Sequence, residues 1–303
     1  MISSLELARL CGVSQGTVDR ALHGRSGVAE ATRTRILATA AEHGYRANPA
    51  ARELMGRAVS SLVGAVVDQG WQQASFFIEL LGTVHRRLRR DGLRLVIAFA
   101  DDDADQRAAI DELAARRVRG LLLIHPPGSL VLPLHLGIPV VSLVQAHAGV
   151  PSPLPDERAM GAAAARHLLD LGHRRLAWLG YPDANPVTID RYEGFRAAAA
   201  RGGATVLATT GIDAALAGDA TAIACHHDPL ARRLLGACAA RGVRVPEDRS
   251  VVGIDGTGPD DGLSTVVYPI AAVADAAAVL LAGGTIGPIA AGTVRQGRTT
   301  ARA

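Results

Sequence analysis

The sequence predicts a small all-α helix-turn-helix head at the N-terminus, followed by an α/β region with two doubly wound parallel-sheet lobes. In the first 45 residues, apolar side chains recur at helical spacing between capping signals. From residue 61 onward, short continuous apolar runs alternate with helical stretches, which is typical of parallel sheets covered by helices on both faces. The chain therefore divides into a head (1–46), a hinge and linker (47–60) and a two-lobed region (61–303).

Composition places the chain among ordinary globular proteins. Of its 303 residues, 49% are hydrophobic and 20% are charged, which is enough apolar material for a buried core. The sequence has no run of about 18 apolar residues and no basic and apolar signal-peptide pattern at its start, so we expect no membrane span and a cytoplasmic location. Three scattered cysteines, Cys11, Cys225 and Cys238, fit reduced thiols better than a disulfide framework or a zinc site.

Positive charge is concentrated near the N-terminus. Residues 1–60 contain eight arginines and five acidic residues, a net charge of +3, whereas residues 61–303 hold 24 basic and 24 acidic residues. All of the net charge of the chain therefore lies in its first fifth. This asymmetry predicts that a polyanion binds the head.

The head contains the pattern of a helix-turn-helix. Ala8 lets two helices cross closely, Gly12 forms the tight turn, and Val18 fills the angle between the helices. Ser3 and Glu6 have the spacing of a capping box at the start of the first helix. The three predicted helices span 4–11, 15–23 and 30–43.

The apolar residues of these helices predict one small core. Leu7 points inward from the first helix and Val18 from the second. The third helix is expected to offer Ile36, Leu37 and Ala40 to the same core.

The second helix is predicted to lie in the major groove of DNA with its first residues on the base edges. Gln15 can bond bidentately to adenine, and Gly16 leaves room for a base or a thymine methyl group. Ser14, Thr17 and Arg20 suit contacts to phosphates or bases on the same exposed face. The alternative is a small helical bundle with solvated charges, because short helix-turn-helix patterns also arise by chance.

A short helix is predicted over residues 49–55. Asn48 is a favourable N-cap, and Pro49 is a favourable first residue. Two turns are marginal in isolation, and Ala51 and Leu54 have no local core to bury them. The segment is therefore expected to be unstable by itself.

The head and the hinge together resemble the LacI family of transcription regulators. The resemblance implies that the short helix orders only on operator DNA and that two copies enter the minor groove. It also implies that Leu54 wedges into the central base step and kinks the duplex, and that Asn48 and Ala51 belong to the same DNA-binding segment. The matching residues are 7–14, 17–20, 32–33, 44–48, 51 and 54.

Two residues of the head depart from the family pattern. Asp19 stands where serine is commonest, and a carboxylate near DNA is repelled unless it accepts from cytosine or pairs with an arginine. Ala29 stands where a helix-capping serine is usual, and the lost cap could cost about 1 kcal/mol. Both departures leave the motif intact but obscure the operator sequence.

Residues 61–303 resemble the effector domain of the LacI family, which is similar to periplasmic sugar-binding proteins. Two such lobes would face each other across a cleft for a small molecule. The stretch from Val206 to Ala222 is short for the family and is expected to lack part of a helix. The matching segments are 75–77, 118–121, 137–141, 171–175, 191–195, 245–248 and 252–255. The predicted strands span 62–67, 93–99, 120–124, 139–143, 175–179, 204–208, 221–225 and 250–254. The predicted helices span 76–90, 105–117, 157–171, 190–201, 228–241 and 269–283.

Polar residues at the ends of these strands are predicted to bind the effector. Carboxylates and arginine can each make two hydrogen bonds to adjacent sugar hydroxyls, and an aromatic ring can pack against a sugar ring. The resemblance therefore implies a sugar or a related polyol as effector. The candidate residues are Asp68, Trp71, Phe76, His125, Asp156, Arg191, His227, Asp228 and Asp255.

Several of these residues have a purely structural alternative. Asp156 and Asp228 could cap the helices that follow them. Trp71 and Phe76 could be ordinary core or lid residues. The family usually has Asn-Asp where this chain has His227-Asp228, which implies a changed effector. Three adjacent residues, 226–228, rarely converge on one ion, so no metal site is expected.

These observations predict a DNA-binding transcription regulator, most simply a repressor, that forms a homodimer and is switched between two states by a small molecule. A sugar-binding protein without regulatory DNA binding is the alternative, but it leaves the head unexplained. An enzyme is not expected, because no nucleophile–base set, Walker loop or metal-ligand spacing occurs, and no cofactor is implied. Residues 294–303 carry no leucine heptads, which favours a dimer over a coiled-coil tetramer.

Overall fold

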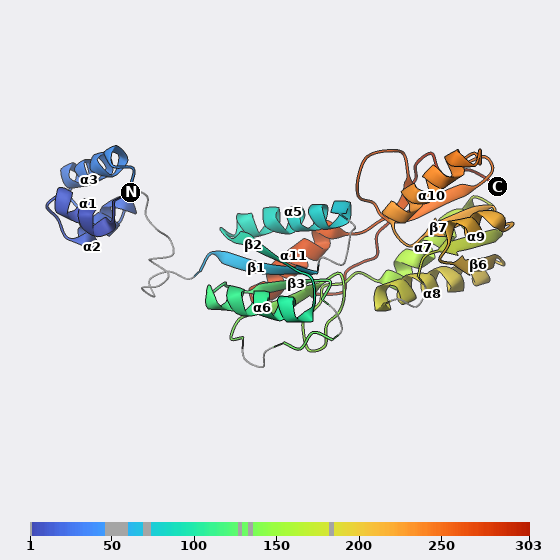
Figure 1. Ribbon diagram of the computed structural model, residues 1–303, viewed down its shortest axis with the longest axis horizontal. Coiled ribbons are helices and arrows are strands. Elements are labelled where there is room, and N and C mark those ends of the chain that lie inside the picture. The colour runs from blue at the N-terminus through green and yellow to red at the C-terminus, as the bar shows by residue number, and fades with distance from the viewer. Residues whose placement is uncertain (1, 46–59, 69–73, 127–128, 133–135, 182–184) are drawn as a thin grey trace. The chain divides into compact units, whose positions relative to one another are not determined.

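The computed structural model describes residues 2–45, 60–68, 74–126, 129–132, 136–181 and 185–303 (Figure 1). The chain forms two compact units, Met1–Ser60 and Ser61–Ala303. Each unit has its own hydrophobic core, and they are described separately below. The predicted helix 49–55 lies outside the described residues.

Three short helices form the head: α1 (Ser4–Leu10), α2 (Gln15–Leu22) and α3 (Glu30–Glu42). The Ser3–Glu6 capping box is present, and Gly12 takes a φ of +60°, the left-handed conformation that ends α1. Ala29 begins α3 without a side-chain cap, as the sequence indicated. The core consists of Leu7, Ala8, Cys11, Val18, Ala21, Ile36 and Ala40.

Leu37 does not belong to this core. Its side chain is 45% exposed, whereas the neighbouring Ile36 is fully buried. Adjacent helical residues point about 100° apart, so the narrow contact between α3 and the other two helices buries only one of them. The prediction for Leu37 was therefore wrong.

The first lobe of the second unit is built on a four-stranded parallel sheet in the order β2-β1-β3-β4. Helices α5 and α11 pack on one face and α6 on the other. Alternate residues of β1 serve the two faces, with Val63 and Val67 toward α5 and Val66 toward α6. The strands are β1 (Leu62–Asp68), β2 (Arg94–Ala100), β3 (Leu121–Ile124) and β4 (Val140–Leu143), and the helices are α5 (Ala74–Arg90), α6 (Asp103–Ala115) and α11 (Ile270–Leu281).

The second lobe holds a six-stranded sheet in the order β10-β9-β8-β7-β5-β6, parallel except for β10. Helices α7 and α8 cover one face, and α9 and α10 cover the other. The strands are β5 (Arg175–Leu179), β6 (Thr205–Thr209), β7 (Ala222–Cys225), β8 (Ser250–Asp255), β9 (Ser264–Val267) and β10 (Val294–Arg295), and the helices are α7 (Glu157–Asp170), α8 (Pro186–Arg201), α9 (Ile212–Ala217) and α10 (Asp228–Ala240).

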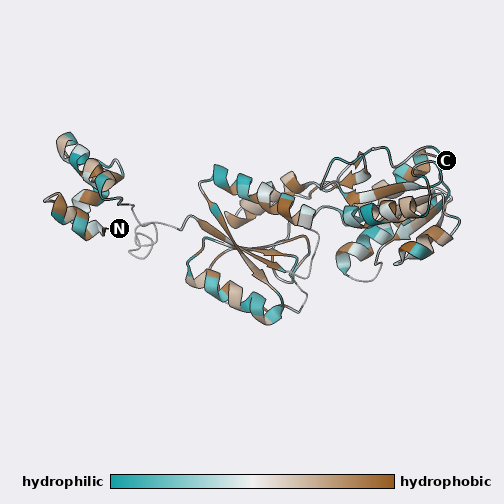
Figure 2. Ribbon diagram, turned by 45° about the horizontal axis from the view of Figure 1, so that its top comes forward, coloured by the Kyte–Doolittle hydropathy of each residue, from teal (hydrophilic) through white to brown (hydrophobic). Residues whose placement is uncertain are grey.

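In both lobes apolar strands lie between helices whose outer faces are hydrophilic (Figure 2). This layering confirms the prediction of two doubly wound parallel-sheet lobes. Three elements were not predicted, namely α9, β9 and β10. They are too short, or in β9 too polar at the start, to give a periodic signal. Helix α8 also begins four residues earlier than predicted, because Asn185 caps it and Pro186 is its first residue.

Three described segments connect the lobes: 145–156, 268–269 and 282–293. They arise because α11 follows β9 of the second lobe in sequence but packs on α5 and β4 of the first lobe. Parallel strands end at one edge of each sheet, so loops from both lobes meet at the connecting segments. None of the described helices is long and apolar enough to span a membrane.

Candidate ligand pocket and nucleic-acid interface

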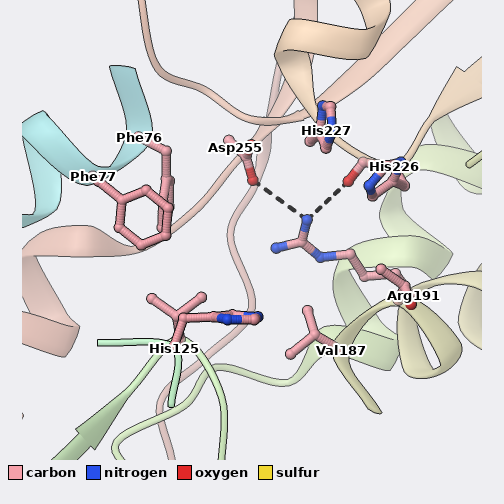
Figure 3. A pocket seen from close by; sticks show the side chains of 10 residues that line it. Phe76, Phe77, His125, Val187, Arg191, His226, His227 and Asp255 are labelled. Atoms are coloured by element: carbon pink, nitrogen blue, oxygen red, sulfur yellow. Dashed lines mark hydrogen bonds and ion pairs between the residues drawn. The ribbon is translucent and has the colours of Figure 1, made fainter. Parts of the chain in front are cut away.

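A hollow of about 390 Å³, part of it open to solvent, lies between the two lobes of the second unit (Figure 3). The first lobe contributes two aromatic rings, an imidazole and an aliphatic side chain. The second lobe contributes all of the charged residues that line it. The lining residues are Phe76, Phe77, His125 and Val144 of the first lobe, and Val187, Thr188, Arg191, His226, His227 and Asp255 of the second.

Arg191 of α8 is the central polar group of the pocket. Its Nε donates to Glu157 Oε2 at 2.6 Å, and its Nη1 donates to the His226 carbonyl at 2.8 Å and to Asp255 Oδ1 at 3.3 Å. Burial lowers the pKa of the guanidinium, but Glu157 and Asp255 outweigh it and raise this pKa above its ordinary value. No described residue accepts from Nη2, which points toward Phe77 and His125 (Figure 3). The two N–H groups of Nη2 are therefore available to a ligand.

Close packing of α7 against α8 brings Glu157 and Arg191 together. A Cβ on Gly161 of α7 would lie 1.8 Å from the Arg191 carbonyl oxygen, and a Cβ on Gly194 of α8 would lie 1.9 Å from the Arg158 carbonyl oxygen. Only glycine permits this approach at both positions. The first residue of α7, Glu157, then contacts the guanidinium of Arg191 in the second turn of α8.

Asp255 ends β8 and contacts Nη1 of Arg191, whereas Glu157 contacts its Nε. Its φ of +131° is strained for a residue with a side chain, and such strain is often kept at ligand sites. Burial raises the pKa of Asp255 to about 8, although Arg191 acts to lower it. The buried Oδ2 has no hydrogen-bond partner among the described residues. This oxygen can therefore bond to a ligand.

Two histidines lie side by side between β7 and α10. The Nδ1 of His227 accepts from the Leu230 N–H at 2.9 Å and so caps α10, which leaves the Nε2 of the neutral ring as a hydrogen-bond donor. The His226 ring packs 3.9 Å from that of His227, and Gly180 leaves room for it. Burial lowers the pKa of His226 to about 2 and that of His227 to about 4. Both rings are therefore neutral near pH 7.

His125 directly follows β3 and completes the pocket from the first lobe. Its φ of +55° is left-handed. Burial lowers its pKa to about 4, although the charge of Asp68 at the end of β1 acts to raise it. The pocket thus combines three neutral imidazoles with one guanidinium that is already paired with Glu157 and hydrogen-bonded to Asp255. Its polar lining suits hydrogen bonding to an uncharged ligand.

The structure brings together five of the nine residues that the sequence predicted for the effector: Phe76, His125, Arg191, His227 and Asp255. Asp68 lies at the end of β1 outside the lining, and Trp71 lies outside the described residues. Their roles, like those of the five lining residues, stay predictions.

Asp156 and Asp228 do not reach the pocket. Asp156 caps α7 through the Ala159 N–H and borders a separate hollow. Asp228 is fully buried and does not cap α10, because His227 does. Its carboxylate instead accepts from Thr265 Oγ1 at 2.6 Å and from the backbone N–H groups of residues 256 and 257, and so anchors the loop after β8.

Sequence reasoning missed several residues of this site. Phe77 adjoins the predicted Phe76, and Val187 and Thr188 lie in the first turn of α8, which the prediction left out. Val144 and His226 also line the hollow. Glu157 supports Arg191 from 34 residues away in the sequence. An Asn-Pro pair at 185–186 was the one local signal that could have extended α8.

The residues predicted to contact DNA in the head are the N-cap of α2 and four residues along this helix. Ser14 caps this helix through the Thr17 N–H, and Gln15 Nε2 donates to Ser4 Oγ at 2.6 Å. Ser14, Gln15, Gly16 and Arg20 are exposed, and Thr17 is half-buried. Ser14, Thr17 and Arg20 also hydrogen-bond to one another along this side of the helix. Asn48, Ala51 and Leu54 lie outside the described residues.

Asp19 is neutralised within the head. Its carboxylate forms an ion pair with Arg25 at 3.3 Å, which is one of the two conditions under which a carboxylate tolerates nearby DNA. The family departure at this position is thus compensated locally. Among the described residues, His, Cys, Asp and Glu form no group of three that could hold a metal ion.

Comparison with known families accounts for both units. Residues 5–48 match the bacterial regulatory proteins of the lacI family. Residues 60–223 match the periplasmic binding proteins and sugar-binding domain of the LacI family, and residues 165–302 match a periplasmic binding protein-like domain. The chain belongs to the LacI family.

Relatives within the LacI family are named as transcriptional regulators. GntR of Pseudomonas aeruginosa is 32% identical over 82% of this chain and 78% of its own length. AscG of Escherichia coli is 27% identical over 84% of this chain and 82% of its own. Because residues 5–48 match the regulatory-protein model of the family and these relatives are named as transcriptional regulators, this LacI-family chain is a DNA-binding transcription regulator.

Solved structures share the fold. A complex of the regulator CelR with cellobiose is similar with a TM-score of 0.66 and 25% identity, covering 99% of this chain and 100% of that one. A lac repressor dimer bound to operator and an anti-inducer is similar with a TM-score of 0.82 and 21% identity, covering 99% of both chains. At this identity the second likeness shows the fold of the LacI family alone.

Proposed function

We propose that this LacI-family regulator is a repressor whose affinity for its operator is set by a small, uncharged, hydroxylated effector, such as a sugar or polyol. The observation that carries the proposal is the position of Arg191. The guanidinium is buried between Glu157 and Asp255, and its Nη2 group faces a hollow lined by Phe76 and Phe77.

The chemistry of the hollow favours hydroxyl groups. Nη2 of Arg191 can donate to an oxygen, and Oδ2 of Asp255 can exchange a hydrogen bond with the same or an adjacent hydroxyl. The positive charge of Arg191 is already paired with Glu157, so an anionic ligand would gain little there. The aromatic rings of Phe76 and Phe77 can pack against the apolar face of a sugar ring. The complex of CelR with cellobiose, which has the same fold, supports this ligand class.

The head supplies the DNA-binding half of the proposal. Ser14, Gln15, Gly16, Thr17 and Arg20 are proposed to read or position the operator from α2. A hinge containing Asn48, Ala51 and Leu54 is proposed to enter the minor groove. The solved lac repressor is a dimer on its operator, which supports a homodimer here.

Coupling between the two halves requires that the effector bind one arrangement of the lobes more tightly than the other. The aromatic rings and the charged residues of the pocket belong to different lobes. The contacts that an effector makes would therefore depend on how the two lobes are arranged. The differential affinity is expected to change operator binding by about 1–3 kcal/mol, which is roughly 5- to 150-fold.

A titration with labelled DNA tests both halves. Duplexes from the region upstream of the gene are mixed with full-length protein, with and without D-glucose, D-ribose, D-xylose, cellobiose and sorbitol. We expect site-selective, salt-sensitive binding that one neutral sugar or polyol changes at least fivefold. Binding without any response would contradict the effector half. Sugar binding, seen by calorimetry, without any DNA binding would favour a sugar-binding protein that does not regulate transcription.

Leu54→Ser tests the hinge separately. The variant should weaken binding to the selected duplex and leave calorimetric sugar binding unchanged, because residue 54 lies outside the two-lobed unit. Equal affinity of the variant and the wild type for this duplex would refute the wedge role of Leu54.

A further inference from the structure

Five exposed arginines surround the point at which the chain enters the first lobe. The backbone N–H of Arg94 donates to the Ser61 carbonyl at 2.8 Å, and that of Arg119 donates to the Leu62 carbonyl at 2.7 Å, so the two arginines flank the first residues of β1. Helices α5 and α6 run opposite to the strands and finish at this same edge (Figure 1). The resulting arginine rim consists of Arg89, Arg90, Arg94, Arg117 and Arg119.

The arginine rim differs from other basic residues nearby in that its charges are not paired. Arg87 forms ion pairs with Asp91 and Asp275, and Arg116 pairs with Glu112. Within the described part of the chain, none of the five rim side chains has an ion pair or a hydrogen bond to another residue. The rim therefore presents five uncompensated positive charges.

Overall composition does not explain this concentration of charge. Residues 61–303 contain equal numbers of basic and acidic residues, so the rim is a local excess that is balanced elsewhere in the unit. Arg117 also has a φ of +54° just after α6, a position where glycine would avoid strain. Like charges that are crowded at one edge repel one another, and a polyanion would relieve this repulsion.

We infer that the arginine rim binds the phosphate backbone of DNA next to the segment that the head reads. The inference rests on the DNA-binding function of the head and adds a second contact surface in the two-lobed unit. Arginine suits this partner because its planar guanidinium bonds to phosphate oxygens bidentately. Residues 46–59 join the head to this edge. Fourteen residues span at most about 50 Å, which is the length of about 15 base pairs, so one duplex can reach both surfaces.

Binding to phosphates has a specific signature in its dependence on salt. Each phosphate that the protein no longer neutralises should reduce the slope of log affinity against log salt concentration by about 0.9 for duplex DNA. Arg94→Gln combined with Arg119→Gln should therefore reduce the slope by up to about 1.8 per protomer. The double substitution should also weaken binding roughly tenfold at 50 mM salt and much less at 200 mM.

The experiment measures fluorescence anisotropy of a labelled 40-base-pair duplex of random sequence with the full-length protein at 50, 100 and 200 mM NaCl. The matched control is Arg166→Gln with Arg201→Gln, which removes two exposed, unpaired arginines from α7 and α8 of the second lobe. Thermal unfolding of both double variants should match the wild type, because all four side chains are exposed.

The rim variant should lose affinity and salt dependence, and the control should keep both. A 15-base-pair duplex leaves little DNA beyond the head. With this duplex, the difference in DNA affinity between the rim variant and the wild type should be smaller. Equal binding by the rim variant and the wild type, or an equal loss in the control, would overturn the inference. Failure of the DNA-binding function itself would look different, since the wild type would then fail to bind any duplex at 50 mM NaCl.

Discussion

The two lobes contribute unlike halves to one pocket. The first lobe provides the rings of Phe76 and Phe77, the aliphatic Val144 and a neutral His125, whereas the second provides Arg191, Asp255 and their supporting contacts. Hydrogen-bond recognition is therefore organised mostly within one lobe before a ligand arrives. Closure of the other lobe over a ligand would add apolar contact and exclude water. This division would suit a switch in which a ligand stabilises one arrangement of the two lobes over another.

The charged half also carries the larger cost in stability. Arg191, Glu157 and Asp255 are all nearly removed from water, and desolvating such groups often offsets their mutual attraction. The first lobe has no comparable group among its described lining residues. Substitutions should therefore affect stability most in the second lobe.

Arg191→Met should have the largest effect. It leaves the Glu157 carboxylate buried without its cation and Asp255 without its guanidinium partner, which should lower the free energy of unfolding by about 3–5 kcal/mol and abolish the effector response. Urea unfolding measures the first effect, and DNA titration with sugar measures the second. Arg158→Met, which removes an exposed ion pair with Asp190, should cost about 0–1 kcal/mol. Equal losses in the two variants would refute the buried network.

Stability should also depend on pH, chiefly through the second lobe. The pKa values of His226 and His227 fall to about 2 and 4 by burial, and that of His125 falls to about 4. In the unfolded chain these three histidines become protonated near pH 6.5, whereas in the folded chain they stay neutral until the pH is much lower. Stability should therefore fall on acidification from about pH 6.5 toward 4, by about 1.4 kcal/mol per pH unit for each histidine.

Asp255 should act in the opposite direction. Its pKa rises to about 8 by burial, so the unfolded chain ionises this group near pH 4 and the folded chain does not until about pH 8. Its contribution to stability is therefore lost as pH rises through this range. The four groups together should give maximum stability near pH 6.5, measured by urea unfolding from pH 5 to 8.5. Asp255→Asn should remove the decline above pH 6.5, and an unchanged decline would contradict this assignment.

Gly161→Ala should disturb the crossing of α7 and α8. The added methyl group would meet the Arg191 carbonyl oxygen at a distance that the backbone must relieve by moving, so we expect a loss of about 1–3 kcal/mol together with weaker sugar binding. Gly236→Ala in α10 is the matched control, because nothing lies within 4 Å of its added Cβ. That variant should gain up to about 1 kcal/mol from helix propensity. The comparison fails if both variants shift the unfolding midpoint alike.

Phe77→Leu should have the smallest effect, because it only trims the apolar wall of the first lobe. We expect a loss of stability below about 1.5 kcal/mol and sugar affinity reduced roughly threefold, measured by calorimetry. Phe99→Leu alters an exposed ring of β2 and should change neither quantity. A larger effect on affinity than that of Gly161→Ala would reverse the ranking of the two lobes.

The sequence by itself determined the parts of this protein that depend on local chemistry. Capping by Ser3 and Ser14, the turn at Gly12 and the alternation of apolar strands with helices are short-range signals, and all appear in the structure. The exposed face of α2 that we propose contacts the operator could be placed for the same reason, since a helix and its cap fix which side chains share a face.

Only the tertiary structure decided which polar groups form the pocket. Asp228 and Asp255 both follow strands of the second lobe, yet Asp228 anchors a loop and Asp255 meets Arg191. The partnership of Glu157 with Arg191 depends on how two helices cross, and no local pattern encodes it. Burial and pairing arise from segments that are distant in sequence, so the charge and hydrogen-bonding capacity of the site were fixed only when the lobes folded.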